Sequence, residues 1–288
     1  MIVKVAITRE RADLSFLTSI FNVQMNAMNK KQQHIRKSWI QATRFHPLTD
    51  AEVRTQVVQK VRETREEPVV IFDLDSTLYE VGPRTFKILK EWSQSAQAGQ
   101  HDVLARRLKD LDLNHVGYSL KDTFQSLGVS LEDSQMIESL RAAKQFWLTR
   151  FFSNDYLTHD RPYEGAARYV SEVFQAGARL VYLTGRDEPG MGRGTREKLK
   201  ADGFPINDPR IHFFLKPQRE GDDELHKAQA SHDIRKLGNV VASFENEPRN
   251  VITLSQAIPQ AMHIFLDTVC SDHPAEPGDG LYILRKFD

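Results

Sequence analysis

Residues 68–78 read PVVIFDLDSTL, and this stretch decides how the chain folds. Its first five residues are apolar without interruption, which is typical of a strand that is buried on both faces of a parallel sheet. Two aspartates follow this run directly, with one residue between them. In an extended chain Asp73 and Asp75 point the same way, while Leu74 points into the protein. The stretch therefore predicts a buried strand with two carboxylates at its carboxyl end.

Four further apolar runs have the length of a strand. They are Arg179–Leu183, Ile211–Leu215, Val240–Phe244 and His263–Leu266. A helical pattern precedes each run, and most of these helices stop at a glycine. Strands that alternate with helices in this way predict a Rossmann-like α/β fold, in which helices flank a parallel sheet on both faces.

The segment between the first two predicted strands does not follow this alternation of strands and helices. It spans about 100 residues and holds no strong strand candidate, whereas Pro83 begins a helical pattern. A second helical stripe consists of Leu140, Ala143, Trp147 and Phe151. We therefore expect an inserted α-helical cap, residues 80–155, on an α/β core of residues 66–79 and 156–288. The aromatic stripe is expected to lie in the cap's own core.

The amino-terminal residues 1–65 are basic, with twelve Lys/Arg and five Asp/Glu. We expect them to form a basic, helical extension, with one helix over residues 51–65. The basic segment 30–44 could contact phosphate or an acidic partner, or it could be a solvated helix face. Since Met25 and Met28 are alternative starts, residues 1–28 could be an upstream extension of the native product.

Composition and charge exclude several classes of protein. The whole chain has 39 basic and 39 acidic residues, so it has no overall field that would attract nucleic acid, and we expect nucleic-acid binding to be unlikely. A single cysteine, Cys270, excludes an internal disulfide and a multi-cysteine zinc site. No apolar run reaches the roughly 18 residues that a membrane span needs. With no convincing export signal, we expect a cytoplasmic protein without a membrane partner.

The two aspartates indicate metal-assisted chemistry. Carboxylates next to an apolar strand are costly unless positive charge lies beside them, and a divalent cation would supply that charge. The spacing suits a pair in which one carboxylate attacks and the other moves protons. The alternative is a loop with two solvated aspartates.

The stretch resembles the first motif, DxDxT, of the haloacid dehalogenase (HAD) superfamily of phosphatases and phosphotransferases. Three further motifs of that superfamily follow in order. A strand ends in Thr184-Gly185, Lys227 begins the helix before the fourth strand, and Glu245 follows that strand. The resemblance covers residues 68 to 270 and implies an α/β core with a cap that closes over the substrate.

The resemblance also implies roles at the reacting centre. Asp73 would be the nucleophile that forms an aspartyl-phosphate, and Asp75 would protonate the leaving oxygen and later deprotonate water. Mg²⁺ would be bound by the Asp73 carboxylate, the Asp75 backbone carbonyl and the Glu245 carboxylate. Because the superfamily usually has Asp at the last of these positions, direct binding of the metal by Glu245 is left open.

Phosphate binding is implied for three positions: the Thr184 hydroxyl, the Gly185 N–H and the Lys227 ammonium. Lys216, which follows the third strand, is the alternative motif lysine. Other candidate site residues are Thr77, Arg186, Glu247 and Asn250. Arg186 could contact substrate or pair with a surface acid, and Glu247 and Asn250 are candidates for the outer metal shell.

The function that the resemblance implies is a Mg²⁺-dependent phosphohydrolase acting on a small phosphate monoester. Asp75 favours an ester over a haloacid, because an alkoxide needs a proton in order to leave. The alternatives are a phosphotransferase or nucleic-acid end phosphatase, and a non-catalytic phosphate-binding module. The glycine-rich residues 188–194 lack the order of a dinucleotide-binding loop, and we interpret them as a flexible turn near the site.

Overall fold

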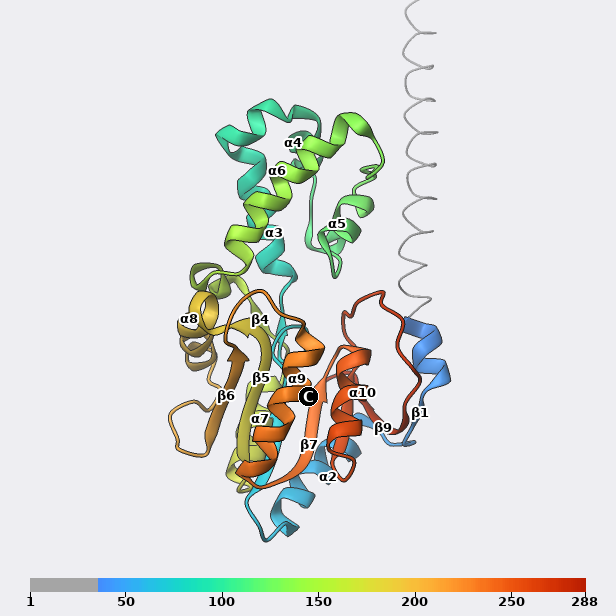
Figure 1. The fold of residues 1–288 in the computed structure, drawn as a ribbon, viewed down its shortest axis with the longest axis vertical. Coiled ribbons are helices and arrows are strands. Elements are labelled where there is room, and N and C mark those ends of the chain that lie inside the picture. Colours follow the sequence, from blue (N-terminus) through green and yellow to red (C-terminus); the bar gives the residue numbers. More distant parts are fainter. Residues whose placement is uncertain (1–35) are drawn as a thin grey trace, which may run out of the picture.

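The computed structural model describes residues 36–288. Their helices and strands form an α/β unit with a helical insert beyond the carboxyl ends of its strands (Figure 1). The expectations for residues 1–28 lie outside the described residues, as do those for Lys30 and Lys31. Within the described range, no helix has the length and apolar character that crossing a bilayer requires.

The α/β unit contains one sheet of seven parallel strands in the order β1-β9-β8-β7-β2-β5-β6. This confirms the predicted Rossmann-like fold and its five strands. The strands are β1 (Arg44–Phe45), β2 (Pro68–Phe72), β5 (Arg179–Asp187), β6 (Ile211–Lys216), β7 (Asn239–Glu245), β8 (Met262–Leu266) and β9 (Asp279–Leu284). The sequence did not reveal β1 and β9, which lie at one edge, because β1 has two residues and β9 starts with Asp279-Gly280.

Helices cover both faces of the sheet. The side chains of Val70 and Phe72 pack toward α2 (Asp50–Glu63) and α7 (Ala166–Gln175). Those of Val69 and Ile71 pack toward α9 (Asp223–Ile234) and α10 (Pro248–Ala257), as expected for a strand buried on both sides. In Figure 1, α9 and α10 lie in front of the sheet. The helices of this unit are α2 (Asp50–Glu63), α7 (Ala166–Gln175), α8 (Glu188–Ala201), α9 (Asp223–Ile234), the short turn η4 (Arg235–Leu237) and α10 (Pro248–Ala257).

The predicted helix over residues 51–65 is confirmed by α2, but the described part of the amino-terminal residues is not a separate extension. Strand β1 pairs with β9 at the sheet edge, and α2 buries four valines in the sheet's hydrophobic core. Thr49 caps α2 by accepting a hydrogen bond from the backbone N–H of Glu52. Residues 44–63 therefore belong to the α/β unit, because the apolar face of α2 is stable only when it is packed.

The helical insert comprises residues 82–159 and has its own hydrophobic core, which includes Leu89, Trp92 and Phe124. Two short strands, β3 (Tyr79–Glu80) and β4 (Arg161–Pro162), pair antiparallel where the chain enters and leaves it. Its elements are α3 (Gly82–Gln94), η1 (Ala96–Gln100), α4 (Asp102–Lys109), η2 (Leu113–His115), α5 (Leu120–Ser126), α6 (Ser134–Phe151) and η3 (Asn154–His159).

The aromatic stripe of α6 is divided between two environments. Leu140 and Ala143 pack in the insert's hydrophobic core, as predicted. Trp147 and Phe151 are absent from every hydrophobic cluster of the described chain, and they line a cavity instead. The prediction was therefore wrong for the second half of the stripe, because α6 extends beyond the insert's core toward the α/β unit.

The glycine-rich residues 188–194 form the first turns of α8, and the predicted flexible turn is wrong. Asp187 caps the helix by accepting a hydrogen bond from the backbone N–H of Gly190 at 2.7 Å. A Cβ atom at Gly194 would lie 2.6 Å from the backbone oxygen of Asn154. Glycine is needed here because α8 packs directly against η3.

Candidate active site

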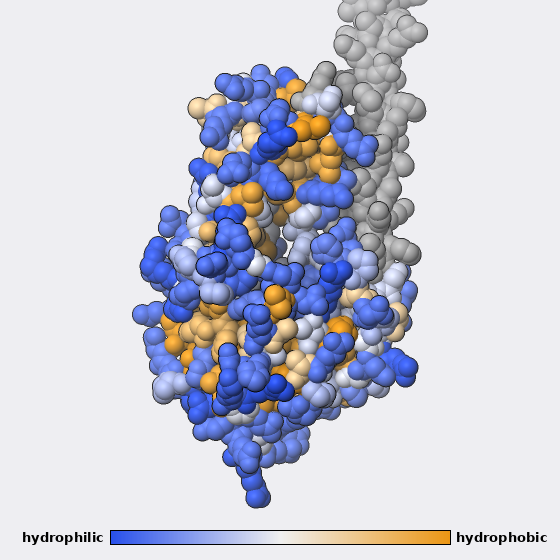
Figure 2. Space-filling model, in the orientation of Figure 1, coloured by the Kyte–Doolittle hydropathy of each residue, from blue (hydrophilic) through white to orange (hydrophobic). Residues whose placement is uncertain are grey.

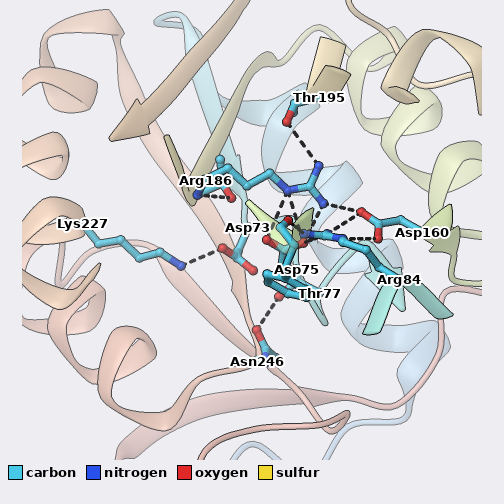
Figure 3. A network of polar contacts seen from close by, with 11 residues as sticks. Asp73, Asp75, Thr77, Arg84, Asp160, Arg186, Thr195, Lys227 and Asn246 are labelled. Atoms are coloured by element: carbon cyan, nitrogen blue, oxygen red, sulfur yellow. Dashed lines mark hydrogen bonds and ion pairs between the residues drawn. The ribbon is translucent and has the colours of Figure 1, made fainter. Parts of the chain in front are cut away.

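The register of the sheet brings two acidic residues together at its carboxyl end. Phe72 of β2 pairs with Phe244 of β7, so the residues that follow them, Asp73 and Glu245, are neighbours. Lys227, from α9, places its Nζ atom 2.7 Å from Asp73 Oδ1 (Figure 3). The same ammonium also forms an ion pair with Glu245 Oε2. All three side chains are buried. The register of the sheet and helix α9 thus place two buried carboxylates around one buried ammonium group.

Burial strongly perturbs the titration of this group. Burial and the nearby Glu245 carboxylate raise the pKa of Asp73 to about 7, although Lys227 opposes both effects. Burial lowers the pKa of Lys227, but Asp73 and Glu245 outweigh it and hold that pKa above its usual value. Lys227 therefore stays charged, while Asp73 takes up a proton readily when no further cation is present.

Asp75 points away from this trio into a network of buried charges. Arg186 Nη2 lies 2.6 Å from Asp75 Oδ1, and Arg84 Nη2 lies 3.0 Å from the same oxygen. Asp160 completes the network, with Oδ2 at 2.6 Å from Arg84 and 2.9 Å from Arg186 (Figure 3). Arg84, Asp160 and Arg186 are almost fully buried, whereas the Asp75 side chain is 33% exposed. Two guanidinium groups are thus matched by two carboxylates.

The arginines determine the charge state of Asp75. Burial raises the pKa of Asp75, but Arg186 and Arg84 outweigh burial and hold the pKa below its usual range. Burial lowers the pKa of Arg186, and Asp75 and Asp160 reverse this effect. In this arrangement Asp75 is an ionised carboxylate.

Local backbone geometry explains why Asp73 and Asp75 differ in direction. The backbone N–H groups of Leu78 and Tyr79 both donate to the carbonyl of Leu74 at 2.9 Å, which closes a tight turn after β2. Ser76 adopts a φ of 61° within this turn, a conformation that costs a non-glycine residue energy. The turn therefore directs Asp75 toward Arg84 of the insert and Arg186 of β5.

A cavity of about 1050 Å³ lies between the sheet end and the insert. Its lining includes Asp73, Asp75, Lys227 and Glu245 on the side of the α/β unit. The reacting groups predicted from the sequence therefore share one cavity with side chains of the insert.

Solved structures with a similar fold include phosphatases. One, described as "Putative Phosphatase from Clostridium difficile", has a TM-score of 0.50 and 15% identity over 77% of this chain and 96% of that one. This chain therefore shares the Rossmann-like α/β fold of a solved phosphatase structure. A predicted phosphatase from Clostridium acetobutylicum is 16% identical, with a TM-score of 0.44 over 77% of this chain and 94% of its own. No protein-family model matches the sequence, and comparison with curated proteins gives no match.

The carboxylates at the end of β2 and β7 fit a hard divalent cation. Asp73 and Glu245 both face a single buried positive charge, and Mg²⁺ takes one or two carboxylates together with waters and phosphate oxygens. Among residues 36–288, no cluster of three or more His, Cys, Asp or Glu side chains is arranged to hold a metal. Because the Asp75 side chain is bound by arginines, only its backbone carbonyl is left for such an ion.

The predicted phosphate-binding residues occupy different environments. Gly185 lines the cavity, and a Cβ atom there would lie 2.5 Å from Asp223 Oδ2. Thr184 is fully buried, and its hydroxyl accepts a hydrogen bond from the backbone N–H of Arg186 at 3.3 Å. Thr77 is also buried and donates to Asn246 Oδ1 at 3.0 Å, which fixes the turn to the loop after β7. The phosphate-binding roles remain predictions.

The two candidate lysines have different partners in the structure. Lys216 binds Asp223 Oδ1 at 2.7 Å and the backbone oxygen of Gly221 at 3.0 Å, and it does not line the cavity. Lys227 lies between the two site carboxylates. The geometry therefore favours Lys227 as the motif lysine.

The backbone after β7 fixes the position of the Glu245 carboxylate. The backbone N–H of Glu247 donates to Glu245 Oε1 at 2.9 Å, and the Glu247 carboxylate accepts from the backbone N–H of Ser271 at 3.0 Å. Asn250 is buried and lines the cavity. The Glu247 side chain thus binds Ser271, whereas Asn250 lines the cavity and stays a candidate for the outer metal shell.

Two members of the charge network were missed by the sequence analysis. Arg84 lies in the first turn of α3, and Asp160 follows η3, so the two residues come from opposite ends of the insert. Neither belongs to a motif, and no local pattern pairs residues that are 76 positions apart. Arg186 was predicted to contact substrate or to pair with a surface acid. It lines the cavity and binds two acids, Asp75 and the buried Asp160, and its contact with substrate stays a prediction.

The raised pKa of Asp73 predicts a pH-dependent stability. In metal-free protein the folded state retains the Asp73 proton up to about pH 7, whereas the unfolded chain loses it near pH 4. The free energy of unfolding should therefore fall as the pH rises through this window, by on the order of 1 kcal/mol or more. Urea unfolding in EDTA, at steps between pH 4 and pH 8, measures this slope. Asp73→Asn should flatten it, and an unchanged slope in that variant would contradict the assignment.

Proposed function

We propose that this protein is a Mg²⁺-dependent phosphohydrolase that cleaves small phosphate monoesters through an aspartyl-phosphate on Asp73. The observation that supports it most directly is the buried Asp73 carboxylate at the cavity floor, 2.7 Å from the Lys227 ammonium and beside Glu245. A buried carboxylate that faces a cavity and is held by a lysine suits a nucleophile whose substrate is anionic. The resemblance to the HAD superfamily adds to this support.

In the first step, an Asp73 carboxylate oxygen attacks the phosphorus atom. A phosphorus–oxygen bond to the alcohol breaks, and the leaving oxygen needs a proton, which we assign to Asp75. The arginines hold Asp75 ionised before substrate binds. A phosphate dianion beside Arg186 would share its guanidinium, weaken its hold on Asp75 and favour protonation of that carboxylate.

In the second step, the ionised Asp75 accepts a proton from water. The water oxygen attacks the phosphorus of the aspartyl-phosphate, the bond to Asp73 breaks, and inorganic phosphate is released. Lys227 offsets the negative charge of Asp73 and Glu245 in both steps. Mg²⁺ bound by Asp73, Glu245 and the Asp75 carbonyl would supply positive charge to the phosphate oxygens. The helical insert would act as the cap that excludes water during the first step.

Release of inorganic phosphate from a panel of small phosphate esters tests this function. We expect turnover with Mg²⁺, a loss of about 10²-fold or more in EDTA, and recovery when Mg²⁺ is added back. A protein that holds Mg²⁺ and a beryllofluoride phosphate mimic but releases no phosphate would contradict a hydrolase. It would instead indicate the phosphate-binding module.

The two lysines provide a matched pair of variants. Lys227→Met leaves Asp73 and Glu245 buried without their cation, so kcat should fall about 10²- to 10³-fold. Lys216 does not itself line the cavity, and its partner Asp223 is half exposed, so Lys216→Met should change kcat by less than about threefold. Steady-state kinetics of both variants on one ester measures this contrast. A larger loss in Lys216→Met would contradict the assignment of Lys227.

A further inference from the structure

The leaving group of a bound phosphate ester would have to point toward the insert. Asp75, which handles the leaving oxygen in the proposed reaction, contacts Arg84 at 3.0 Å. The Arg84 guanidinium in turn lies 4.3 Å from the centre of the Phe151 ring. The insert's wall of the cavity therefore begins directly beside the group that meets the leaving oxygen.

Aromatic side chains form the part of this wall that lies beside Arg84. Trp147 and Phe151 stack with ring centres 4.2 Å apart, and Phe152 meets Phe151 edge-on at 5.0 Å. None of the three belongs to a hydrophobic cluster of the described chain, yet all three line the cavity. They therefore expose apolar surface toward the cavity.

Further apolar side chains line the cavity, Tyr118 and Ile137 from the insert and Val269 from the α/β unit. Five large hydrophobic side chains are exposed in the described part of the chain, and Tyr118, Ile137 and Val269 among them line this cavity. In Figure 2, hydrophobic side chains gather on the insert above the hollow that separates it from the α/β unit. Exposed apolar surface that is concentrated in one cavity is typical of a binding site for an apolar ligand.

Uncharged polar groups on this wall are few, and they are already engaged. Thr85 Oγ1 accepts a hydrogen bond from Trp147 Nε1 at 3.1 Å, and Ser119 Oγ donates to Asp122 at 2.6 Å. A sugar would leave hydroxyl groups unpaired against such a wall, which costs binding free energy. The exposed cations Lys121 and Lys144 also line the cavity and would attract the phosphate dianion.

We propose that the substrate is the phosphate monoester of a large apolar alcohol, whose hydrocarbon part packs against Trp147, Phe151 and Ile137. This inference rests on the phosphohydrolase function proposed above. The cavity, about 1050 Å³, lies at the upper end of the roughly 300–1,000 Å³ that ligand sites span, so it holds much more than a phosphate group.

A homologous series of n-alkyl phosphates tests the inference. With Mg²⁺ and substrates below their micelle concentrations, kcat/KM should rise about fourfold for each methylene that enters the cavity. Between butyl and octyl phosphate, which differ by four methylenes, this amounts to about 250-fold. A flat series with measurable methyl phosphate turnover would overturn the inference and leave the phosphohydrolase function intact. So would a preference for glucose 6-phosphate over octyl phosphate, whereas no turnover of any ester would overturn the proposed function itself.

Two exposed apolar residues of the insert provide the matched variants. Ile137 is 42% exposed and lines the cavity, whereas Val103 is 54% exposed and lies outside it. Ile137→Ser should lower the ratio of octyl to methyl phosphate kcat/KM about fivefold. Val103→Ser should leave both this ratio and the activity unchanged. Equal ratios in the two variants would contradict apolar binding by this wall.

Discussion

Replacing Asp73 by asparagine should reduce phosphate release by at least about 10⁴-fold, the largest effect that we expect on activity. The amide cannot form the aspartyl-phosphate, and the neighbouring Glu245 is not placed to replace it, because that carboxylate is held by Lys227 and the backbone N–H of Glu247. A pre-steady-state burst of alcohol release, which reports formation of the aspartyl-phosphate, should also disappear.

The same variant should fold at least as stably as the parent protein. Asparagine keeps an oxygen for Lys227, while the negative charge that burial and Glu245 destabilise is removed. A melting temperature equal to or above that of the parent at pH 8, without metal, checks this. Glu224→Gln is a suitable control, since Glu224 is an exposed carboxylate that lines the same cavity and should change turnover by less than about threefold. Turnover retained by Asp73→Asn would exclude the covalent mechanism.

Replacing Asp160 by alanine should lower the free energy of unfolding by about 3–5 kcal/mol, the largest expected effect on stability. Asp160 accepts hydrogen bonds from Arg84 at 2.8 and 2.6 Å and from Arg186 at 2.9 Å, and all three side chains are buried. Without it, two buried guanidinium groups share the single carboxylate of Asp75. Urea denaturation monitored by circular dichroism measures the change.

Asp155→Ala is the control from the same segment. The Asp155 side chain is 85% exposed and lies 3.7 Å from its partner Arg193, so its loss should change the free energy of unfolding by less than about 0.5 kcal/mol. If the two variants were equally stable, the Asp160 network would not contribute to folding. A loss confined to Asp160→Ala would show that this network holds the two ends of the insert to the sheet.

Much of the site follows from local sequence patterns. Apolar strands that end in polar residues indicate which side chains reach the carboxyl edge of the sheet, so the sequence alone is enough to group Asp73, Lys227 and Glu245. The pattern could not choose between Lys227 and Lys216 with certainty, because both follow the expected elements. Their partners decide the question: Lys227 binds Asp73 and Glu245, whereas Lys216 binds Asp223.

By itself, the sequence determined the strand run of residues 68–72, the alternation of helices and strands, and the two carboxylates after β2. These are local features, since periodicity and motif spacing act between residues that are close along the chain. Only the tertiary structure decided that Asp75 is held by Arg84 and Arg186, and that Trp147 and Phe151 face a cavity. Those contacts join distant segments, and their stability comes from burial and charge pairing, which appear only when the chain is folded.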